Sequence, residues 1–67
     1  MADERIRRQI AIIAARLMYA REESEYFTAK RKAARQMGVD FRFLPKDLPS
    51  NAEIREQISA FANVYEG

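Results

Sequence analysis

Residues 6–17 read IRRQIAIIAARL, and the spacing of their apolar side chains decides the fold class. The stripe consists of Ile6, Ile10, Ile13 and Leu17, at steps of 4, 3 and 4. These steps follow the 3.6-residue period of an α-helix, so the four side chains lie on one face. Ile12 falls outside this stripe, and we therefore expect the helix to have apolar contacts on two sides.

Two more segments have the same period. The first runs from Ser24, a residue type that caps helices, to Gly38, which suits the left-handed end of a helix. Its stripe consists of Tyr26, Ala29, Ala33 and Met37. We expect the first and second helices to be separated by a break near residues 22–24, although neither Gly nor Pro marks it.

The third segment begins with Ser50-Asn51-Ala52-Glu53, which is a capping box. In this motif Ser50 accepts from the Glu53 amide, and the Glu53 carboxylate reaches back to the Ser50 amide. The stripe that follows consists of Ile54, Ile58, Phe61 and Tyr65. The sequence thus predicts a single all-α domain over residues 1–67, with helices at about 3–22, 24–37 and 50–66.

Between the second and third helices we predict an ordered loop that contains prolines and aromatic residues. Pro45 and Pro49 exclude a regular helix or a central strand there. We expect the aromatic side chains of the loop to cover the end of the helix packing. The predicted core is Ile6, Ile10, Ile13, Leu17, Tyr26, Ala33, Met37, Leu48, Ile54, Ile58 and Phe61.

Composition limits the chemistry of this 67-residue chain, which has no His, Cys or Trp. Zinc fingers, disulfides, haem ligation and imidazole or thiol catalysis are excluded. Its hydroxyl groups have no imidazole to activate them. Asp40 and Asp47 could bind a divalent cation, but a pair of isolated aspartates is more typical of an ordinary loop than of a metal site. We expect no catalytic residue, no metal ligand, no cofactor and no enzymatic activity.

The chain also lacks an apolar segment of the roughly 20 residues that a membrane span needs. The charged start Met1-Ala-Asp-Glu-Arg5 does not resemble a secretory signal. We therefore expect a cytoplasmic protein with no membrane contact.

Positive charge is concentrated on the predicted second helix. The chain as a whole has a net charge of +2, whereas residues 28–46 hold six basic side chains against Asp40, a net charge of +5. Candidate contacts to phosphate or nucleic acid are Lys30, Arg31, Lys32 and Arg35. The alternative is a solvated face that pairs with Glu22, Glu23 and Glu25 or with the acidic third helix. A helix-turn-helix is disfavoured, because the third helix is acidic and the loop before it is long.

Some apolar side chains exceed what the predicted core can bury. Candidate interface residues are Ile12, Phe41, Phe43 and Val64, which alternatively cap a compact monomer. We expect a non-catalytic interaction module that self-associates or docks on a larger protein domain. The alternative function is a nucleic-acid-binding accessory domain that uses the basic second helix.

Several runs resemble the N-terminal region of bacterial proteins that carry a minimal nucleotidyltransferase-like domain. These runs are Ala14–Met18, Tyr26, Ala29–Ala34 and Leu48–Arg55, and the stretch LPSNAEI at residues 48–54 is the most distinctive. The Gly-Ser turn and spaced aspartates of the transferase are missing here, so no catalytic residue is carried over. The resemblance implies an accessory module that docks on the transferase domain, on a second copy or on nucleic acid.

Overall fold

Three helices make up the fold, as the sequence predicts. A computed structural model describes residues 4–38 and 48–66. The helices are α1 (Glu4–Tyr19), α2 (Tyr26–Gln36) and α3 (Asn51–Tyr65), and the described residues contain no strand. The predicted ends at residues 22, 37 and 66 are therefore one to three residues too long.

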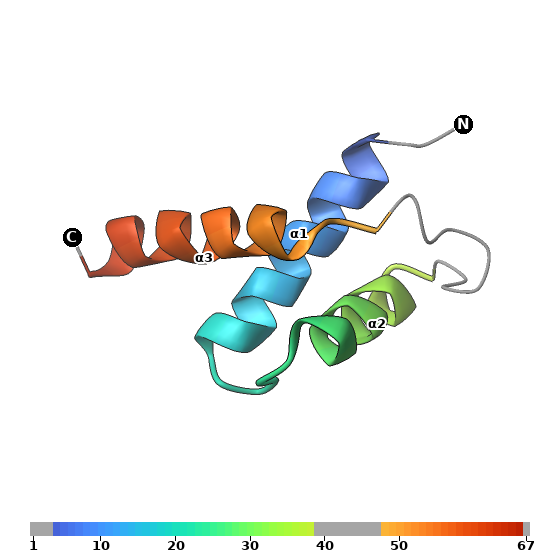
Figure 1. Ribbon diagram of the computed structural model, residues 1–67, viewed down its shortest axis with the longest axis horizontal. Helices are drawn as coiled ribbons and strands as arrows, with labels where there is room; N and C mark the ends of the chain where they lie inside the picture. The colour runs from blue at the N-terminus through green and yellow to red at the C-terminus, as the bar shows by residue number, and fades with distance from the viewer. Residues whose placement is uncertain (1–3, 39–47, 67) are drawn as a thin grey trace.

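Helix α1 is the centre of the molecule, because α2 and α3 both pack on it. Figure 1 shows α3 crossing α1 and extending away from α2. The expectation of apolar contacts on two sides of α1 is thus confirmed.

Alanines fill most of the core between the helices. The buried apolar residues are Ile10, Ala11, Ala14, Ala15, Leu17, Ala29, Ala33, Ala34 and Ile54. Partly buried side chains pack around them: Ile6, Ile13, Met18, Tyr26, Met37, Leu48, Ile58 and Phe61. Small side chains let α1 and α2 approach closely, but each buries little apolar area. All eleven predicted core residues are buried or partly buried.

The break between α1 and α2 is confirmed, and its geometry is that of a Schellman motif. Arg21 adopts a left-handed backbone with φ of 62°. The Arg21 amide donates to the Met18 carbonyl at 3.0 Å, and the Glu22 amide donates to the Leu17 carbonyl at 2.8 Å. These two bonds satisfy carbonyls at the end of the helix. An arginine thus occupies the position where glycine is usual, which is why the sequence does not show the break.

Of the two predicted ends of α2, the C-terminal one is confirmed and the N-terminal one is not. Gly38 is left-handed, with φ of 73°, and its amide donates to the Arg35 carbonyl at 3.0 Å. The predicted cap at Ser24 is wrong, because Glu25 is the N-cap residue and no side chain caps the helix. The turn that follows Arg21 therefore places Ser24 one residue too early to cap α2.

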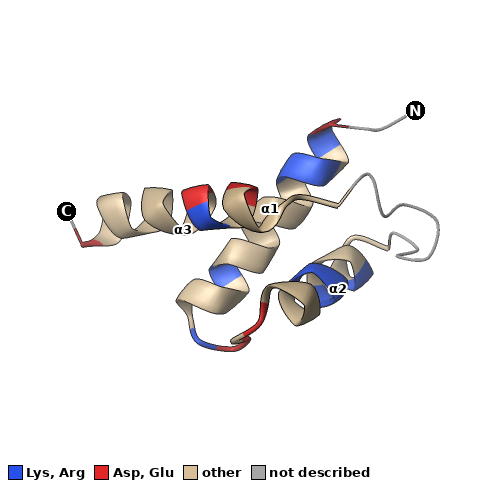
Figure 2. Cartoon of the chain, viewed as in Figure 1, with Lys and Arg blue, Asp and Glu red and all other residues tan. Residues whose placement is uncertain are grey.

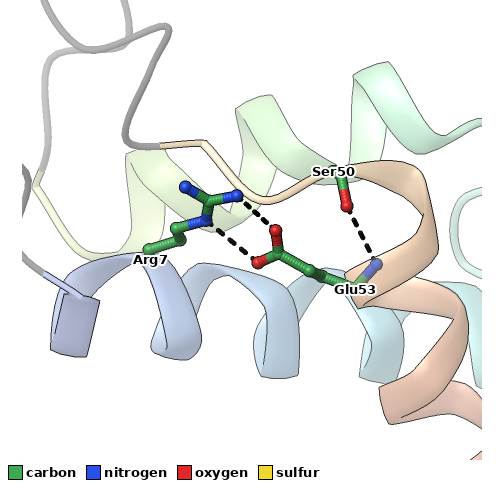
Figure 3. A network of polar contacts seen from close by, with 3 residues as sticks. All are labelled: Arg7, Ser50 and Glu53. Carbon is green, nitrogen blue, oxygen red and sulfur yellow. Dashed lines mark hydrogen bonds and ion pairs between the residues drawn. The ribbon is translucent and has the colours of Figure 1, made fainter.

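The predicted capping box of α3 is present. The Glu53 amide donates to the Ser50 hydroxyl at 3.1 Å. The Glu53 carboxylate is also stabilised by the Ser50 backbone amide, as predicted, and it accepts further hydrogen bonds from Arg7 of α1, which the sequence does not predict (Figure 3). Pro49, immediately before the cap, is fully buried. The predicted aromatic loop, with Pro45, falls mainly on residues 39–47, outside the described residues.

Candidate interaction surfaces

A basic groove lies along the outer face of α2. It has a volume of about 320 Å³ and is lined by Glu23, Thr28, Arg31, Lys32 and Arg35. Thr28, Arg31 and Arg35 lie on one side of the helix because they are three and four residues apart. Figure 2 shows the blue band that Lys and Arg make on α2. The structure therefore brings three of the four predicted basic residues together.

Lys30, the fourth candidate, does not line this groove. It is half-buried and lies two positions from Thr28, on the opposite side of the helix, near the buried Ala29 and Ala33. The cluster of four basic residues in the sequence is thus divided between two faces.

Two contacts constrain the groove in the unbound chain. The Lys32 Nζ lies 3.4 Å from the Glu23 Oε2, as the alternative of pairing with nearby glutamates predicts. The Arg31 guanidinium carbon lies 5.8 Å from the centre of the Phe27 ring. Phe27 is 59% exposed beside the cations, whereas the neighbouring Tyr26 is partly buried against the core.

A second surface lies at the C-terminal end of α3, where an aromatic cluster forms from Tyr19, Phe61 and Tyr65. The ring centres are 6.1 Å apart for Tyr19–Phe61 and Tyr19–Tyr65, and 6.4 Å apart for Phe61–Tyr65. Such distances and tilts are favourable for aromatic pairs. Tyr65 and the neighbouring Val64 are nevertheless 72% and 74% exposed. The cluster therefore presents apolar surface to solvent.

A hydrogen bond fixes one edge of this aromatic cluster. The Tyr19 hydroxyl donates to the Glu66 Oε2 at 2.6 Å. This bond, together with partial desolvation and the charge of Glu66, raises the pKa of Tyr19 above its ordinary 10.0. The Tyr19 hydroxyl therefore stays protonated at neutral pH and ties the end of α1 to the end of α3.

The four predicted interface residues have different outcomes. Val64 is exposed, whereas Ile12 is half-buried, on the side of α1 that also carries Tyr19 seven residues later. Phe41 and Phe43 lie outside the described residues. The sequence analysis missed Tyr19 and Tyr65 as surface residues, since Tyr65 continues the apolar stripe that predicts burial.

A polar groove between α1 and α3 has no counterpart in the sequence prediction. It has a volume of about 440 Å³, and its lining includes Arg7, Arg8, Glu53 and Glu56. The Arg7 Nε donates to the Glu53 Oε2 at 3.0 Å, and the Arg7 Nη2 donates to the Glu53 Oε1 (Figure 3). Arg7 is the main reason that the pKa of Glu53 lies below its ordinary 4.5, and the Ser50 backbone amide and hydroxyl, which interact with the same carboxylate, lower this pKa further. This two-point pair links the two helices across the groove.

Across residues 4–38 and 48–66, no group of three or more His, Cys, Asp or Glu side chains is arranged to hold a metal ion. Asp40 and Asp47 lie outside these ranges. No helix in the same ranges has the length and apolar character to cross a bilayer.

Comparisons with known proteins identify no relative of this chain. No family model, curated protein or solved structure matches the chain. The resemblance to the N-terminal region of nucleotidyltransferase-like proteins thus stays a prediction from the sequence.

Proposed function

We propose that this chain is a non-catalytic helical interaction module, which associates with a second copy of itself through the C-terminal half of α3. Docking of the same surface on a larger nucleotidyltransferase-like domain is the alternative that the resemblance implies. We also propose that the module is cytoplasmic. The chain has no cysteine, whereas small secreted domains usually depend on disulfides.

The observation that carries the proposal is the mismatch between α3 and the surface on which it packs. The apolar stripe of α3 continues to Tyr65, but Ile54 is its one fully buried apolar residue. Phe61 is partly buried, and Val64 and Tyr65 are mostly exposed. Helix α3 diverges from α1 after the two cross (Figure 1), and although the Tyr19 side chain still contacts Phe61 and Tyr65, it does not cover the end of α3.

The alanine-rich core supports association for an independent reason. Among the described residues, six of the nine buried apolar side chains are alanines, so the core buries little area per residue. A scaffold below about 70 residues without disulfides or metals usually needs very efficient packing or a partner. Apolar contact with a second copy adds the buried surface that this core lacks.

The test is the solution mass of the wild-type chain over a hundredfold concentration range, measured by chromatography with light scattering. We expect the mass to rise from one chain towards two. Val64→Lys should keep the chain monomeric over the whole range, because a charge would have to be buried in the interface.

The matched control is Asn63→Lys. Asn63 is exposed, adjacent in sequence and on the side of α3 opposite to Ile54 and Phe61, so it adds the same charge to the same helix outside the proposed interface. We expect this variant to associate as the wild type does. A wild-type mass of one chain at every concentration, or equal effects of the two substitutions, would overturn the proposal.

A further inference from the structure

We propose that the groove on α2 binds the phosphate backbone of a single-stranded nucleic acid, and that Phe27 stacks on one of its bases. This site is distinct from the proposed self-association surface. It lies on the outer face of a different helix, and it works by charge and stacking.

The groove on α2 is rich in positive charge. Arg31, Lys32 and Arg35 line one groove, and helix α2 carries no acidic residue along its length. All three side chains are exposed, so phosphate contact requires little desolvation of the protein. Fixed cations of this kind release condensed counterions from a nucleic acid, which drives binding at low salt.

In the unbound chain, the Glu23 carboxylate occupies part of the groove. Glu23 comes from the turn before α2 and approaches Lys32 at 3.4 Å, a distance at the long end for an ion pair. A backbone phosphate can take the place of this carboxylate, because it likewise carries one negative charge and two oxygens that accept hydrogen bonds from Lys32. Thr28 lies on the same side as Arg31 and Arg35 and adds a hydroxyl donor. Glu23 therefore acts as a counter-ion that competes with the ligand.

The exposed Phe27 ring favours a single strand over a duplex as the ligand. The Phe27 ring is 59% exposed and lies beside the Arg31 guanidinium. An aromatic ring next to a line of cations is the arrangement by which proteins hold single strands, since unpaired bases stack on the ring. Bases of a duplex are already stacked and cannot reach Phe27 in this way.

The experiment is a titration of a fluorescently labelled 20-nucleotide single-stranded RNA with the wild-type chain, followed by anisotropy at several salt concentrations. We expect affinity to fall steeply with salt. The double variant R31Q/R35Q should reduce the slope of log K against log salt by about 1.4, because each lost phosphate contact on a single strand removes about 0.7.

The matched control is K30Q/R55Q, which removes the same charge from outside the groove. Lys30 lies on the opposite side of α2, and Arg55 lies on an exposed position of α3. We expect its slope to equal that of the wild type. Circular dichroism should show the same helix content for both double variants, since all four positions are exposed or half-buried.

Two single variants test the parts of the site separately. Phe27→Ser should weaken RNA binding roughly tenfold without changing the salt slope, because it removes a stacking surface and no charge. Glu23→Gln should strengthen binding severalfold, because it removes the competing carboxylate. A duplex of the same sequence should bind more weakly than the single strand and should not respond to Phe27→Ser.

Three results would overturn the proposal. One is no binding by the wild type at the lowest salt. Another is an equal loss of slope in R31Q/R35Q and K30Q/R55Q, which would indicate general charge attraction. The third is preference for the duplex, which would exclude Phe27 as a stacking surface. Tyr65→Ser should leave RNA binding unchanged, so failure of this site and failure of self-association can be told apart.

Discussion

At the scale of single residues, Arg7 and Glu53 join α1 to α3 although 46 positions separate them in the chain. Both side chains are about one-third exposed, so solvent screens the pair. We predict that Glu53→Gln lowers the free energy of unfolding by about 0.5–1 kcal/mol at pH 7. Urea unfolding at fixed pH measures this difference.

The pH dependence of this difference has a definite sign. The folded-state pKa of Glu53 lies below the ordinary value of 4.5, so the pair stabilises the fold above that pH. The contribution is lost as the pH falls through the lowered pKa, and wild type and variant should converge below that pKa. Glu56→Gln is the control, since Glu56 is exposed on the same helix. A difference that persists unchanged at low pH would show that the ion pair is not its source.

Arg21 gives a second prediction at the residue scale. Its left-handed backbone, with φ of 62°, costs a residue with a Cβ about 1 kcal/mol relative to glycine. Arg21→Gly should therefore stabilise the fold by up to this amount, and Gly38→Ala, at φ of 73°, should destabilise it by a similar amount. Thermal unfolding measures both shifts. A lower Tm for Arg21→Gly would contradict the strain at this position.

At the scale of the helices, Ser50 and Ser24 are both predicted helix caps, and they have different structural roles. Ser50 accepts a hydrogen bond from the Glu53 amide at 3.1 Å, whereas Ser24 caps nothing. Ser50→Ala should cost about 1 kcal/mol of stability, and Ser50→Asp should retain most of it. Ser24→Ala should change stability by less than about 0.5 kcal/mol. Equal effects of the two alanine substitutions in urea unfolding would contradict this assignment.

The helices could be predicted because apolar period and capping residues are local properties. The same spacing predicts that Arg31 and Arg35 share a face and, read more strictly, that Lys30 does not. Glu23 could not be placed in the groove, because its position depends on the left-handed turn at Arg21. The Arg7–Glu53 pair could not be predicted either, since it depends on the crossing of α1 and α3 (Figure 3).

The exposure of Tyr65 shows the limit of the pattern in another way. Periodicity identifies the face of α3 that carries apolar side chains, and this face is the one that packs on α1. Periodicity does not give the angle at which the two helices cross. Because α3 diverges from α1 after the crossing (Figure 1), Tyr65 contacts the Tyr19 ring and is nevertheless 72% exposed.

At the scale of the whole molecule, the small core and the exposed end of α3 together predict that stability depends on concentration. If folding and association are coupled, then raising the concentration from the dissociation constant to a hundred times that value adds roughly 2 kcal/mol to the folded state. For a domain of this size such a gain raises Tm by on the order of 10 °C. Calorimetry over that range should show the rise for wild type and Asn63→Lys, whereas the Tm of Val64→Lys should stay constant. A constant Tm for the wild type, with a cooperative transition, would mean that the alanine-rich core is sufficient by itself and that the aromatic cluster serves another partner.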